Sequence, residues 1–514
     1  MFLGAKKPPT KTVKVAVKKD QKNPQTDAKG LKNKSSQAPL RKTGSGQNLA
    51  VRRVASPASS VASASKSQQF NNLAPPQRNL KRKLGSPAFQ QFSSDSDSNE
   101  EDAEVLSNKR PRSSSETAVD NTTDYKRQPF KVEAVEDIDD KNELILRCAD
   151  VIDEYYKDYK SAFDDVTDTP MIKLQFPSNY RSERYKLLIP KESRKYEPIS
   201  DVVATIDMIC KHYLPEGYVT KQLEGLAPAG NTADLNFKLV SAARQRSAQK
   251  FTEAVELFNR ILKGAMVDGV VASTITDQKS IDIKLVECIL NQIYWRTVLP
   301  DQKLLAKYEN GTSEIYGEIL PIFGHEIFKL TGLRSDHVFI DLGSGVGNLA
   351  LQAALEFGCE SWGIEQMKNP ASLARKQVKE FNARCKRWSI KPGKVTLLEG
   401  DFLASPEIDA AIPRADVIVI NNKAFLPELN AAIALKLLDA PEGCRIVSLK
   451  SFAPDNWELK SFRLHDTRNV LRSVKKQYWS RCVSWSDEGG DYYIATKDTS
   501  QLRKFDEQEN SKRR

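Results

Sequence analysis

The sequence predicts an α/β protein with a doubly wound, mostly parallel sheet, preceded by a mainly helical part and a disordered basic tail. Strand-like and helix-like segments alternate from Val338 onward, and a glycine-rich turn follows the first of these strands. Serial β–α units of this kind form parallel sheets with helices on both faces. The tail is predicted because roughly the first 130 residues hold few apolar side chains to offset the entropy of ordering.

Four segments are expected along the 514 residues. They are residues 1–135 as the disordered tail with an acidic serine run at 93–104, 140–310 as the helical part, 311–500 as the sheet-forming core, and 501–514 as a charged C-terminal tail. In the helical part, residues 248–262 and 281–299 carry apolar side chains at helical spacing. Residues 185–189 and 267–275 are predicted to be strands.

The positive charge of the chain lies in its tail. Residues 1–90 hold nineteen Lys and Arg against two acids, or about +17, whereas the whole chain carries +11. A solvated segment of one sign attracts polyanions by releasing their counterions. Short basic clusters at 81–83 and 109–112 also resemble nuclear localisation signals. The tail is therefore expected to bind nucleic acid, although a purely solubilising role remains open.

Cysteine and histidine usage argues against metal sites and secretion. The seven Cys residues are scattered and there are only four His, so zinc and iron–sulfur spacings are missing. Scattered cysteines of this kind are typical of reduced thiols in the cytosol or nucleus. The sequence shows no apolar run typical of a secretory signal or of a membrane span. We therefore expect no metal and no membrane partner.

The core is predicted to contain five strands and several helices in alternation. The strands are expected at 338–342, 359–365, 395–398, 416–420 and 445–449, and the helices at 348–357, 370–387 and 426–438. The first turn, residues 341–347, contains three glycines, which allow a sharp bend and a ligand lying directly on the backbone. Ligands of such sheets bind at the carboxyl ends of the strands.

Acids at three successive strand ends favour one cofactor. Asp341 would repel a pyrophosphate but suits the cationic methionine end of S-adenosylmethionine. Glu365 can accept hydrogen bonds from both ribose hydroxyls. Asp401 can accept from the adenine amino group, while the ring of Phe402 covers the base. The set favours a Rossmann-like, class I S-adenosylmethionine methyltransferase over a nicotinamide or flavin site.

Several motifs between Lys173 and Lys497 match one family. They are residues 314–319, residues 339–348, the acids Glu365 and Asp401 with Phe402, residues 419–425, residues 483–485, and Tyr492 with Tyr493. This stretch resembles the disruptor-of-telomeric-silencing family of histone-lysine methyltransferases in its fungal form. One departure is Lys423, which stands where the family usually has an aromatic residue near the substrate channel.

The resemblance implies a complete set of site residues. The cofactor would be bound by Tyr316, Gly317, Glu318, Ile319, Phe339, Ile340, Asp341, Leu342, Gly343, Ser344, Gly345, Val346, Gly347, Asn348, Glu365, Asp401 and Phe402. Phe425 and Trp485 would line the substrate channel, and Asn421 and Tyr492 would be catalytic. Core packing is the alternative for Phe425 and Trp485.

The expected reaction needs a neutral lysine amine, and no His lies in these motifs to act as a base. An apolar channel and the positive sulfonium would both disfavour the ammonium form. The side-chain carbonyl of Asn421 can accept a hydrogen bond from the amine and align it.

The resemblance also implies a substrate and a cellular setting. The substrate would be a lysine on the globular face of histone H3 in nucleosomes, with the tail holding nucleosomal DNA. The protein would act in the nucleus, in chromatin silencing and DNA-damage responses.

Two other functions remain possible on the sequence. A nucleic-acid amino methyltransferase also has Asn or Asp after the fourth strand, commonly followed by two prolines and an aromatic residue. Here Asn421 and Asn422 are followed by Lys423 and Ala424, which disfavours that class. A catalytically silent chromatin-binding scaffold is disfavoured by the intact cofactor motif.

Overall fold

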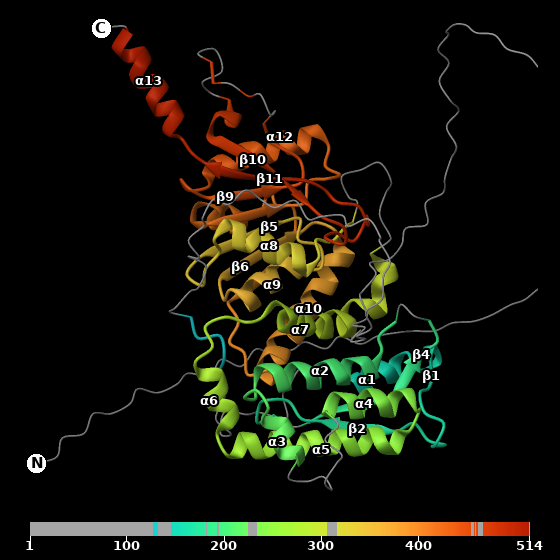
Figure 1. Cartoon of the computed structure of the whole chain (residues 1–514). Coiled ribbons are helices and arrows are strands. Elements are labelled where there is room, and N and C mark those ends of the chain that lie inside the picture. The colour runs from blue at the N-terminus through green and yellow to red at the C-terminus, as the bar shows by residue number, and fades with distance from the viewer. Residues whose placement is uncertain are drawn as a thin grey trace, which may run out of the picture. The chain divides into compact units, whose positions relative to one another are not determined.

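The computed structural model describes residues 127–131 and 145–512, except 181, 193–194, 225–233, 306–315, 454–456, 458 and 461–465 (Figure 1). The basic segment 1–90, the acidic serine run 93–104, and Glu314 and Ile315 of the 314–319 motif lie outside the described residues. Within the described part of the chain, no helix combines the length and apolarity needed to cross a bilayer. That part also shows no cluster of His, Cys, Asp and Glu suited to a metal ion.

The first part of the folded chain is mainly helical, as expected. Its helices are α1 (Cys148–Glu154), α2 (Pro198–His212), α3 (Tyr218–Glu224), α4 (Leu235–Arg244), α5 (Ala248–Val267), α6 (Val270–Thr276) and α7 (Ile283–Thr297), with 3-10 turns at Tyr156–Asp158 and Leu299–Leu304. Two small antiparallel sheets pair β1 (Tyr159–Ser161) with β4 (Leu188–Pro190), and β2 (Met171–Leu174) with β3 (Glu183–Lys186). Helices α5 and α7 confirm the two helices predicted from apolar spacing.

The strand predicted at residues 267–275 is wrong, because this segment forms α6. Val271 and Ile275 are four residues apart and both are buried, as one face of a helix requires. Gly269, with φ of 74°, separates α5 from α6. The strand predicted at 185–189 is interrupted at Leu187, between β3 and β4. Tertiary burial therefore outweighs the β preference of the branched side chains in α6.

The second part contains a seven-stranded sheet in the order β10-β11-β9-β8-β5-β6-β7. The five predicted strands are confirmed as β5 (Val338–Leu342), β6 (Glu360–Glu365), β7 (Val395–Glu399), β8 (Val417–Ile420) and β9 (Arg445–Ser448), all parallel. Two further strands, β10 (Leu471–Tyr478) and β11 (Gly490–Lys497), add an antiparallel edge. Since β5 lies between β6 and β8, the chain reverses its direction of winding at the carboxyl end of β5.

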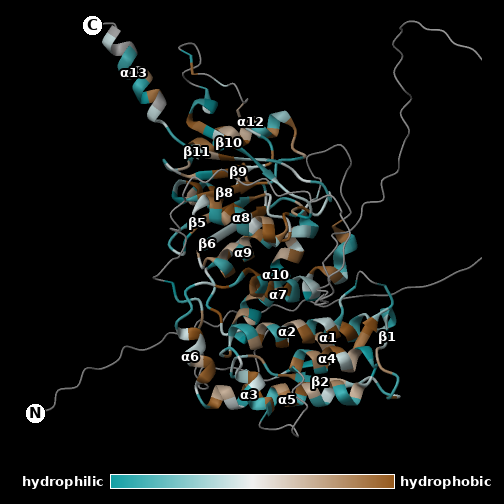
Figure 2. Cartoon of the chain, viewed as in Figure 1, coloured by the Kyte–Doolittle hydropathy of each residue, from teal (hydrophilic) through white to brown (hydrophobic). Residues whose placement is uncertain are grey.

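Helices cover both faces of this sheet. They are α8 (Pro321–Thr331), α9 (Asn348–Glu356), α10 (Lys368–Arg387), α11 (Pro406–Ala411) and α12 (Pro427–Lys436), with 3-10 turns at Ile412–Arg414, Leu437–Asp439 and Thr467–Val470. Alternate residues of β5 enter different cores: Phe339 packs with Phe323 and Phe328, whereas Ile340 packs with the face that includes Ile433. The central strands are brown in Figure 2 because both of their faces are buried.

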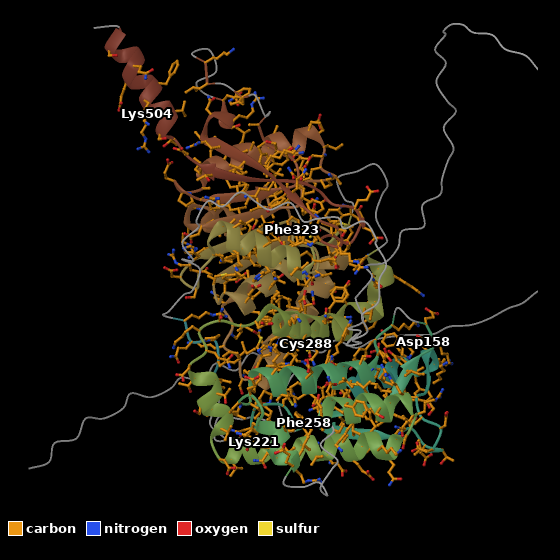
Figure 3. The ribbon with its side chains drawn as sticks, viewed as in Figure 1. Asp158, Lys221, Phe258, Cys288, Phe323 and Lys504 are labelled. Carbon is orange, nitrogen blue, oxygen red and sulfur yellow. The ribbon has the colours of Figure 1, made fainter. Side chains whose placement is uncertain are left out.

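The C-terminal segment forms one more helix, α13 (Ser500–Lys512). It is largely hydrophilic in Figure 2 and extends away from the sheet, with Lys504 labelled along its length in Figure 3. Leu502 packs against one core of the sheet.

A buried ion-pair network joins the helical part to the sheet-forming part. Arg296 of α7 contacts Asp201 at 2.7 Å and Glu183 at 3.1 Å, and Arg384 of α10 contacts Glu183 at 2.5 Å and Glu380 at 2.7 Å. Burial disfavours the charge on Glu183, but Arg384 and Arg296 prevail and lower its pKa to about 2. The labelled Cys288 in Figure 3 lies on α7, one of the two helices that carry this network.

The boundary expected at residue 135 needs correction, because part of the predicted tail is packed. Phe130 lies edge-on to Tyr213 with ring centroids 5.5 Å apart. Arg127 donates to the carbonyl oxygens of Leu355, at 2.6 Å, and Glu356, at the end of α9. Residues 129–131 also exchange backbone hydrogen bonds with 389–391. Residues 127–131 therefore belong to the folded part of the chain.

Candidate active site

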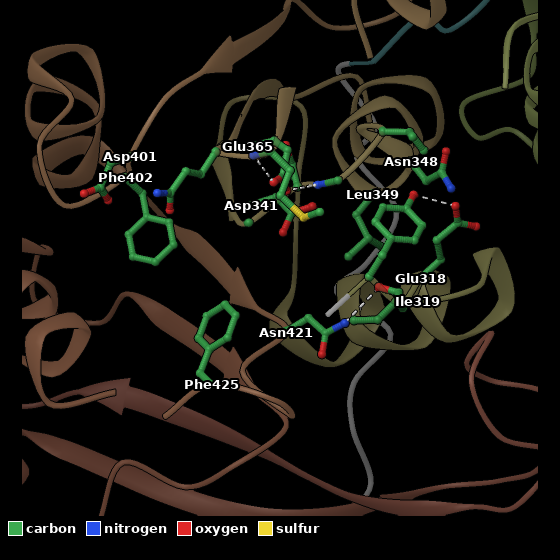
Figure 4. Close-up of a pocket in the computed structure, with 18 of the residues that line it drawn as sticks. Glu318, Ile319, Asp341, Asn348, Leu349, Glu365, Asp401, Phe402, Asn421 and Phe425 are labelled. Carbon is green, nitrogen blue, oxygen red and sulfur yellow. Dashed lines mark hydrogen bonds between the residues drawn. The ribbon is translucent and has the colours of Figure 1, made fainter. Parts of the chain in front are cut away.

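The side chains predicted to bind the cofactor gather at the carboxyl ends of the parallel strands (Figure 4). Register explains this, because Asp341 of β5 lies beside Gly363 of β6 and Val419 of β8. The pocket there is lined by Tyr316, Gly317, Glu318, Ile319, Asp341, Gly343, Ser344, Gly345, Val346, Asn348, Leu349, Glu365, Gln366, Met367, Asp401, Phe402, Leu403, Asn421, Phe425 and Leu429. Four predicted cofactor residues, Phe339, Ile340, Leu342 and Gly347, are outside this lining.

The glycine turn forms the floor of the pocket. Gly343, Gly345 and Gly347 have φ of 86°, 57° and 90°, a left-handed conformation that favours glycine. The N–H groups of Gly343 and Ser344 donate to the carbonyl of Ile364, which ties the turn to β6. A Cβ at Gly345 would lie only 2.9 Å from the ring of Tyr316. The turn thus presents bare backbone to the pocket.

Asp341 places a carboxyl group in the interior of the pocket wall, only 4 % exposed. Burial, and then the nearby charge of Glu365, raise its pKa to about 7. No hydrogen bond from another described residue compensates its charge. A cationic ligand would restore the ionised form, so the position suits a positively charged group.

Glu365 is held by the backbone around it. One carboxylate oxygen accepts from the N–H of Gly345 at 2.9 Å, and the other accepts from Met367 at 2.7 Å. The N–H of Gly400 donates to the main-chain carbonyl of Glu365. This second carboxylate is therefore fixed at the pocket wall, beside the glycine turn.

Two aromatic rings lie together at one end of the pocket. Phe402 and Phe425 are nearly parallel, with an interplanar angle of 28° and centroids 6.4 Å apart. Asp401, next to Phe402, is exposed and accepts from the N–H of Leu403 at 2.8 Å. The sequence predicted a role for Phe402 in covering a base and placed Phe425 in a separate channel. The structure brings both rings to one wall.

The segment 316–319 closes another side of the pocket. The Tyr316 hydroxyl donates to Glu318 at 2.6 Å, and the Gly317 carbonyl accepts from the side-chain amide of Asn421 at 3.1 Å. Ile319 forms an isolated bridge with Val483. The ring of Trp485 packs so closely on Gly317 that a Cβ there would lie 2.6 Å from it.

Comparison with known proteins identifies the family of this chain. Residues 294–497 match the family model described as "Histone methylation protein DOT1". A protein of Aspergillus fumigatus named "Histone-lysine N-methyltransferase, H3 lysine-79 specific" is 41 % identical over 434 residues, or 84 % of each chain. The chain belongs to the DOT1 family. A relative of the same name from Emericella nidulans is 44 % identical over 68 % of each chain, and one from Yarrowia lipolytica is 34 % identical over 68 % of this chain and 70 % of its own.

Solved structures with a similar backbone are more distant. An RNA methyltransferase from Salinibacter ruber in complex with S-adenosyl-L-homocysteine shows 22 % identity and a TM-score of 0.23, over 35 % of this chain and 91 % of its own. A putative O-methyltransferase from Klebsiella pneumoniae shows 15 % identity and a TM-score of 0.28, over 41 % of this chain and 90 % of its own.

The DOT1-family chain is a methyltransferase whose cofactor is S-adenosylmethionine, and its pocket fits that cofactor. The buried carboxyl of Asp341 suits the cationic methionine end, and the fixed carboxylate of Glu365 can accept from two hydroxyls. Phe402 offers an apolar face for a base. The bare backbone of the glycine turn allows close approach at its floor.

Predicted residues outside the DOT1 pocket have other surroundings. Phe339, Ile340 and Leu342 are buried in the two cores and so position the turn. Tyr492 is fully buried against Phe323, and its hydroxyl donates to Glu326 at 3.3 Å. Its catalytic role therefore stays a prediction without a place in the pocket wall.

The two adjacent asparagines of the family motif have different surroundings. Asn422 is fully buried, accepts from the N–H groups of Leu449 and Lys450, and donates to Asn430 and to the carbonyl of Lys450. It thus joins β8 to the end of β9. Asn421 is left to face the pocket, while Lys423 is exposed and outside its lining.

Sequence reasoning missed residues that support the pocket from other elements. Gln377 of α10 donates to the carbonyl of Val346 at 2.7 Å and to Asn348 at 3.0 Å. Tyr294 of α7 donates to Glu318 at 3.2 Å. Gln366 and Met367 also line the pocket, and they could have been predicted because they directly follow Glu365. No local sequence pattern indicates a role in the site for Gln377 or Tyr294.

Proposed function

We propose that this protein transfers methyl groups from S-adenosylmethionine to lysine-79 of histone H3 in nucleosomes. The proposal rests on one observation: Asp341, Glu365 and Asn421 meet in a single pocket in a chain whose relatives are named for that substrate. Nuclear location, and roles in chromatin silencing and DNA-damage responses, are part of the proposal.

The chain's own groups would prepare the lysine amine. Asn421 donates its amide N–H to Gly317, which directs its side-chain carbonyl to serve as an acceptor for the amine. The aromatic ring of Phe425 and the nearby Trp485 provide apolar surfaces, and an apolar environment favours the neutral amine. S-adenosylmethionine, when bound, supplies the electrophilic methyl group. In these apolar surroundings and beside the positive sulfonium, the pKa of the amine would be lowered so that its proton is lost to solvent, and Asn421 would align the neutral amine, so no general base is needed.

The basic tail is proposed to hold nucleosomal DNA. Its charge of about +17 over residues 1–90 suits phosphate contacts that carry no sequence information. A substrate lysine on the surface of a nucleosome requires the enzyme to dock on the particle. A tail that binds DNA raises the local concentration of the catalytic part.

A radiolabelled methyl-transfer assay tests the substrate. Nucleosomes should be methylated, and nucleosomes with arginine in place of lysine-79 of histone H3 should not. Free histone H3, DNA and RNA are the other acceptors to compare. Label on DNA or RNA would favour the nucleic-acid methyltransferase. Cofactor binding without transfer to any acceptor would favour a silent scaffold.

A further inference from the structure

One buried carboxylate in the pocket wall accepts hydrogen bonds from two tyrosines that come from different parts of the chain. An oxygen of Glu318 accepts from Tyr316 at 2.6 Å and from Tyr294 at 3.2 Å. Tyr316 lies two residues before Glu318, whereas Tyr294 belongs to α7 of the helical part. The other Glu318 oxygen is buried with no hydrogen-bond partner among the described residues. The two phenols therefore provide the hydrogen bonds that this carboxylate receives.

The surroundings of these groups make the two hydrogen bonds important. Glu318 is 7 % exposed and Tyr294 is 3 % exposed. Burial raises the pKa of Glu318, while the hydroxyls of Tyr316 and Tyr294 lower it. The ring of Tyr294 packs in a small apolar cluster with Val346 of the glycine turn and Leu373 of α10. In such an apolar setting, the loss of a hydrogen bond to a charged group is costly.

The same tyrosines lie against the glycine turn. The ring of Tyr316 is so close to Gly345 that a Cβ there would approach it to 2.9 Å. One of the dashed lines in Figure 4 ends on the labelled Glu318 and marks the hydrogen bond that this carboxylate accepts from the Tyr316 hydroxyl. Glu318 is in turn tied to the loop between β10 and β11, because its N–H donates to the hydroxyl of Ser484.

We propose that Tyr294, Glu318 and Tyr316 form a clamp that holds segment 316–319 over the glycine turn, with Tyr294 as a positioning residue for cofactor binding. The helical part would then complete the cofactor site through α7, although the residues that line the pocket come from the later part of the chain. The inference relies on S-adenosylmethionine as the cofactor of this pocket.

The substitution Tyr294→Phe tests the clamp, since it removes one hydroxyl and keeps the ring in its apolar cluster. Calorimetry with S-adenosylhomocysteine on the full chain should show a dissociation constant about tenfold higher, as expected for one lost hydrogen bond to a charged group. The KM for S-adenosylmethionine should rise similarly, while kcat at saturating cofactor stays within about twofold. Hydrogen exchange of residues 316–320 should become faster.

Tyr213→Phe is the matched control. Tyr213 is fully buried and its hydroxyl donates to the carbonyl of Trp388 at 2.6 Å, away from the pocket lining. This variant should lose stability yet keep the wild-type affinity and the wild-type exchange of residues 316–320. Unchanged affinity in Tyr294→Phe, with a loss of stability like that of the control, would overturn the clamp.

A double-mutant cycle adds an independent check. Tyr294→Phe and Tyr316→Phe should not have additive effects on the dissociation constant, because both hydroxyls bind one oxygen of Glu318. Strict additivity would contradict a shared clamp. Failure of the wild-type protein to bind S-adenosylhomocysteine would refute the cofactor assignment instead.

Discussion

Asp341 holds a carboxyl group whose charge is unfavourable until a cation arrives. Burial and the charge of Glu365 raise its pKa to about 7, far above the usual value of 3.8 for an aspartic acid side chain. The folded protein without cofactor therefore favours the protonated form, and this contribution to stability is lost as pH rises through about 7. A cationic ligand binds the ionised form of Asp341. Its affinity should therefore rise with pH, whereas the stability of the cofactor-free protein falls.

Cofactor affinity is expected to fall as pH decreases through about 7, by up to about tenfold per pH unit below that value. Calorimetry with S-adenosylmethionine between about pH 8 and about pH 6 measures this. Asp341→Asn is the control, because it should bind weakly at every pH and lose most of the dependence. A flat wild-type profile would show that Asp341 does not meet the cationic end of the cofactor.

Substituting the adjacent residues Asn421 and Asn422 one at a time distinguishes an effect on the orientation of the substrate amine from an effect on the stability of the fold. Asn421→Ala should lower kcat about a hundredfold, because the amine loses its proposed acceptor, with little change in cofactor affinity. Asn422→Ala should mainly lower the melting temperature, because the buried Asn422 side chain makes four hydrogen bonds, to Leu449, Lys450 and Asn430. Steady-state kinetics and thermal unfolding of both variants make the comparison. Equal losses of kcat and affinity in Asn421→Ala would assign it to the cofactor pocket.

Among the elements, α7 and α10 carry the charged contacts between the helical part and the sheet. Glu183 bridges Arg296 and Arg384, and all three side chains are fully buried. Burying such charges is unfavourable unless each is paired, so the network stabilises only while it is complete. The same two helices carry Tyr294 and Gln377, which contact the wall of the pocket.

Glu183→Gln should destabilise the fold by about 3–5 kcal/mol, since it removes the carboxylate that two buried guanidinium groups share and leaves Arg296 only Asp201 and Arg384 only Glu380. Urea unfolding measures the change. Asp336→Asn is the comparison: its exposed pair with Arg334 should contribute less than about 1 kcal/mol. Similar small effects for both variants would mean that water or other groups compensate the buried charges.

At the scale of the whole molecule, removing the tail has two expected effects: loss of DNA binding and, if residues 127–131 are removed with it, loss of stability. A truncation beginning near residue 120 keeps Arg127 and Phe130, whereas one beginning near residue 135 removes them. Both should bind S-adenosylmethionine, and both should bind DNA and nucleosomes weakly with a shallow salt dependence, because the segment of about +17 is gone. Only the truncation that begins near residue 135 should have a lower melting temperature than the full-length protein, because it loses the contacts of Arg127 and Phe130.

Nucleosome affinity measured over a range of salt concentrations, together with thermal unfolding, distinguishes these effects. A tail of shuffled sequence with the same Lys and Arg content should restore binding, and one with glutamine in place of lysine should not. Equal salt slopes for the full-length and truncated proteins would assign docking to the folded part. Equal melting temperatures for the two truncations would mean that residues 127–131 add no stability.

Local sequence patterns were enough to predict the β5–turn–α9 unit and the acids at the strand ends. These features depend on local patterns: an apolar run for a buried strand, glycines for positive φ, and an acid directly after a strand. All five parallel strands were located within a few residues. The family resemblance added the covering segment, of which residues 316–319 do line the pocket.

The distant residues that complete the site and the fold become evident only from how the folded chain packs. Tyr294 reaches Glu318, Phe425 stacks on Phe402, and Arg127 reaches the end of α9, although no local pattern marks these pairs. The helix α6 replaced a predicted strand because Val271 and Ile275 are buried on one face. Such outcomes depend on packing between segments far apart in the chain, as between Arg384 and Glu183, which are separated by 201 positions.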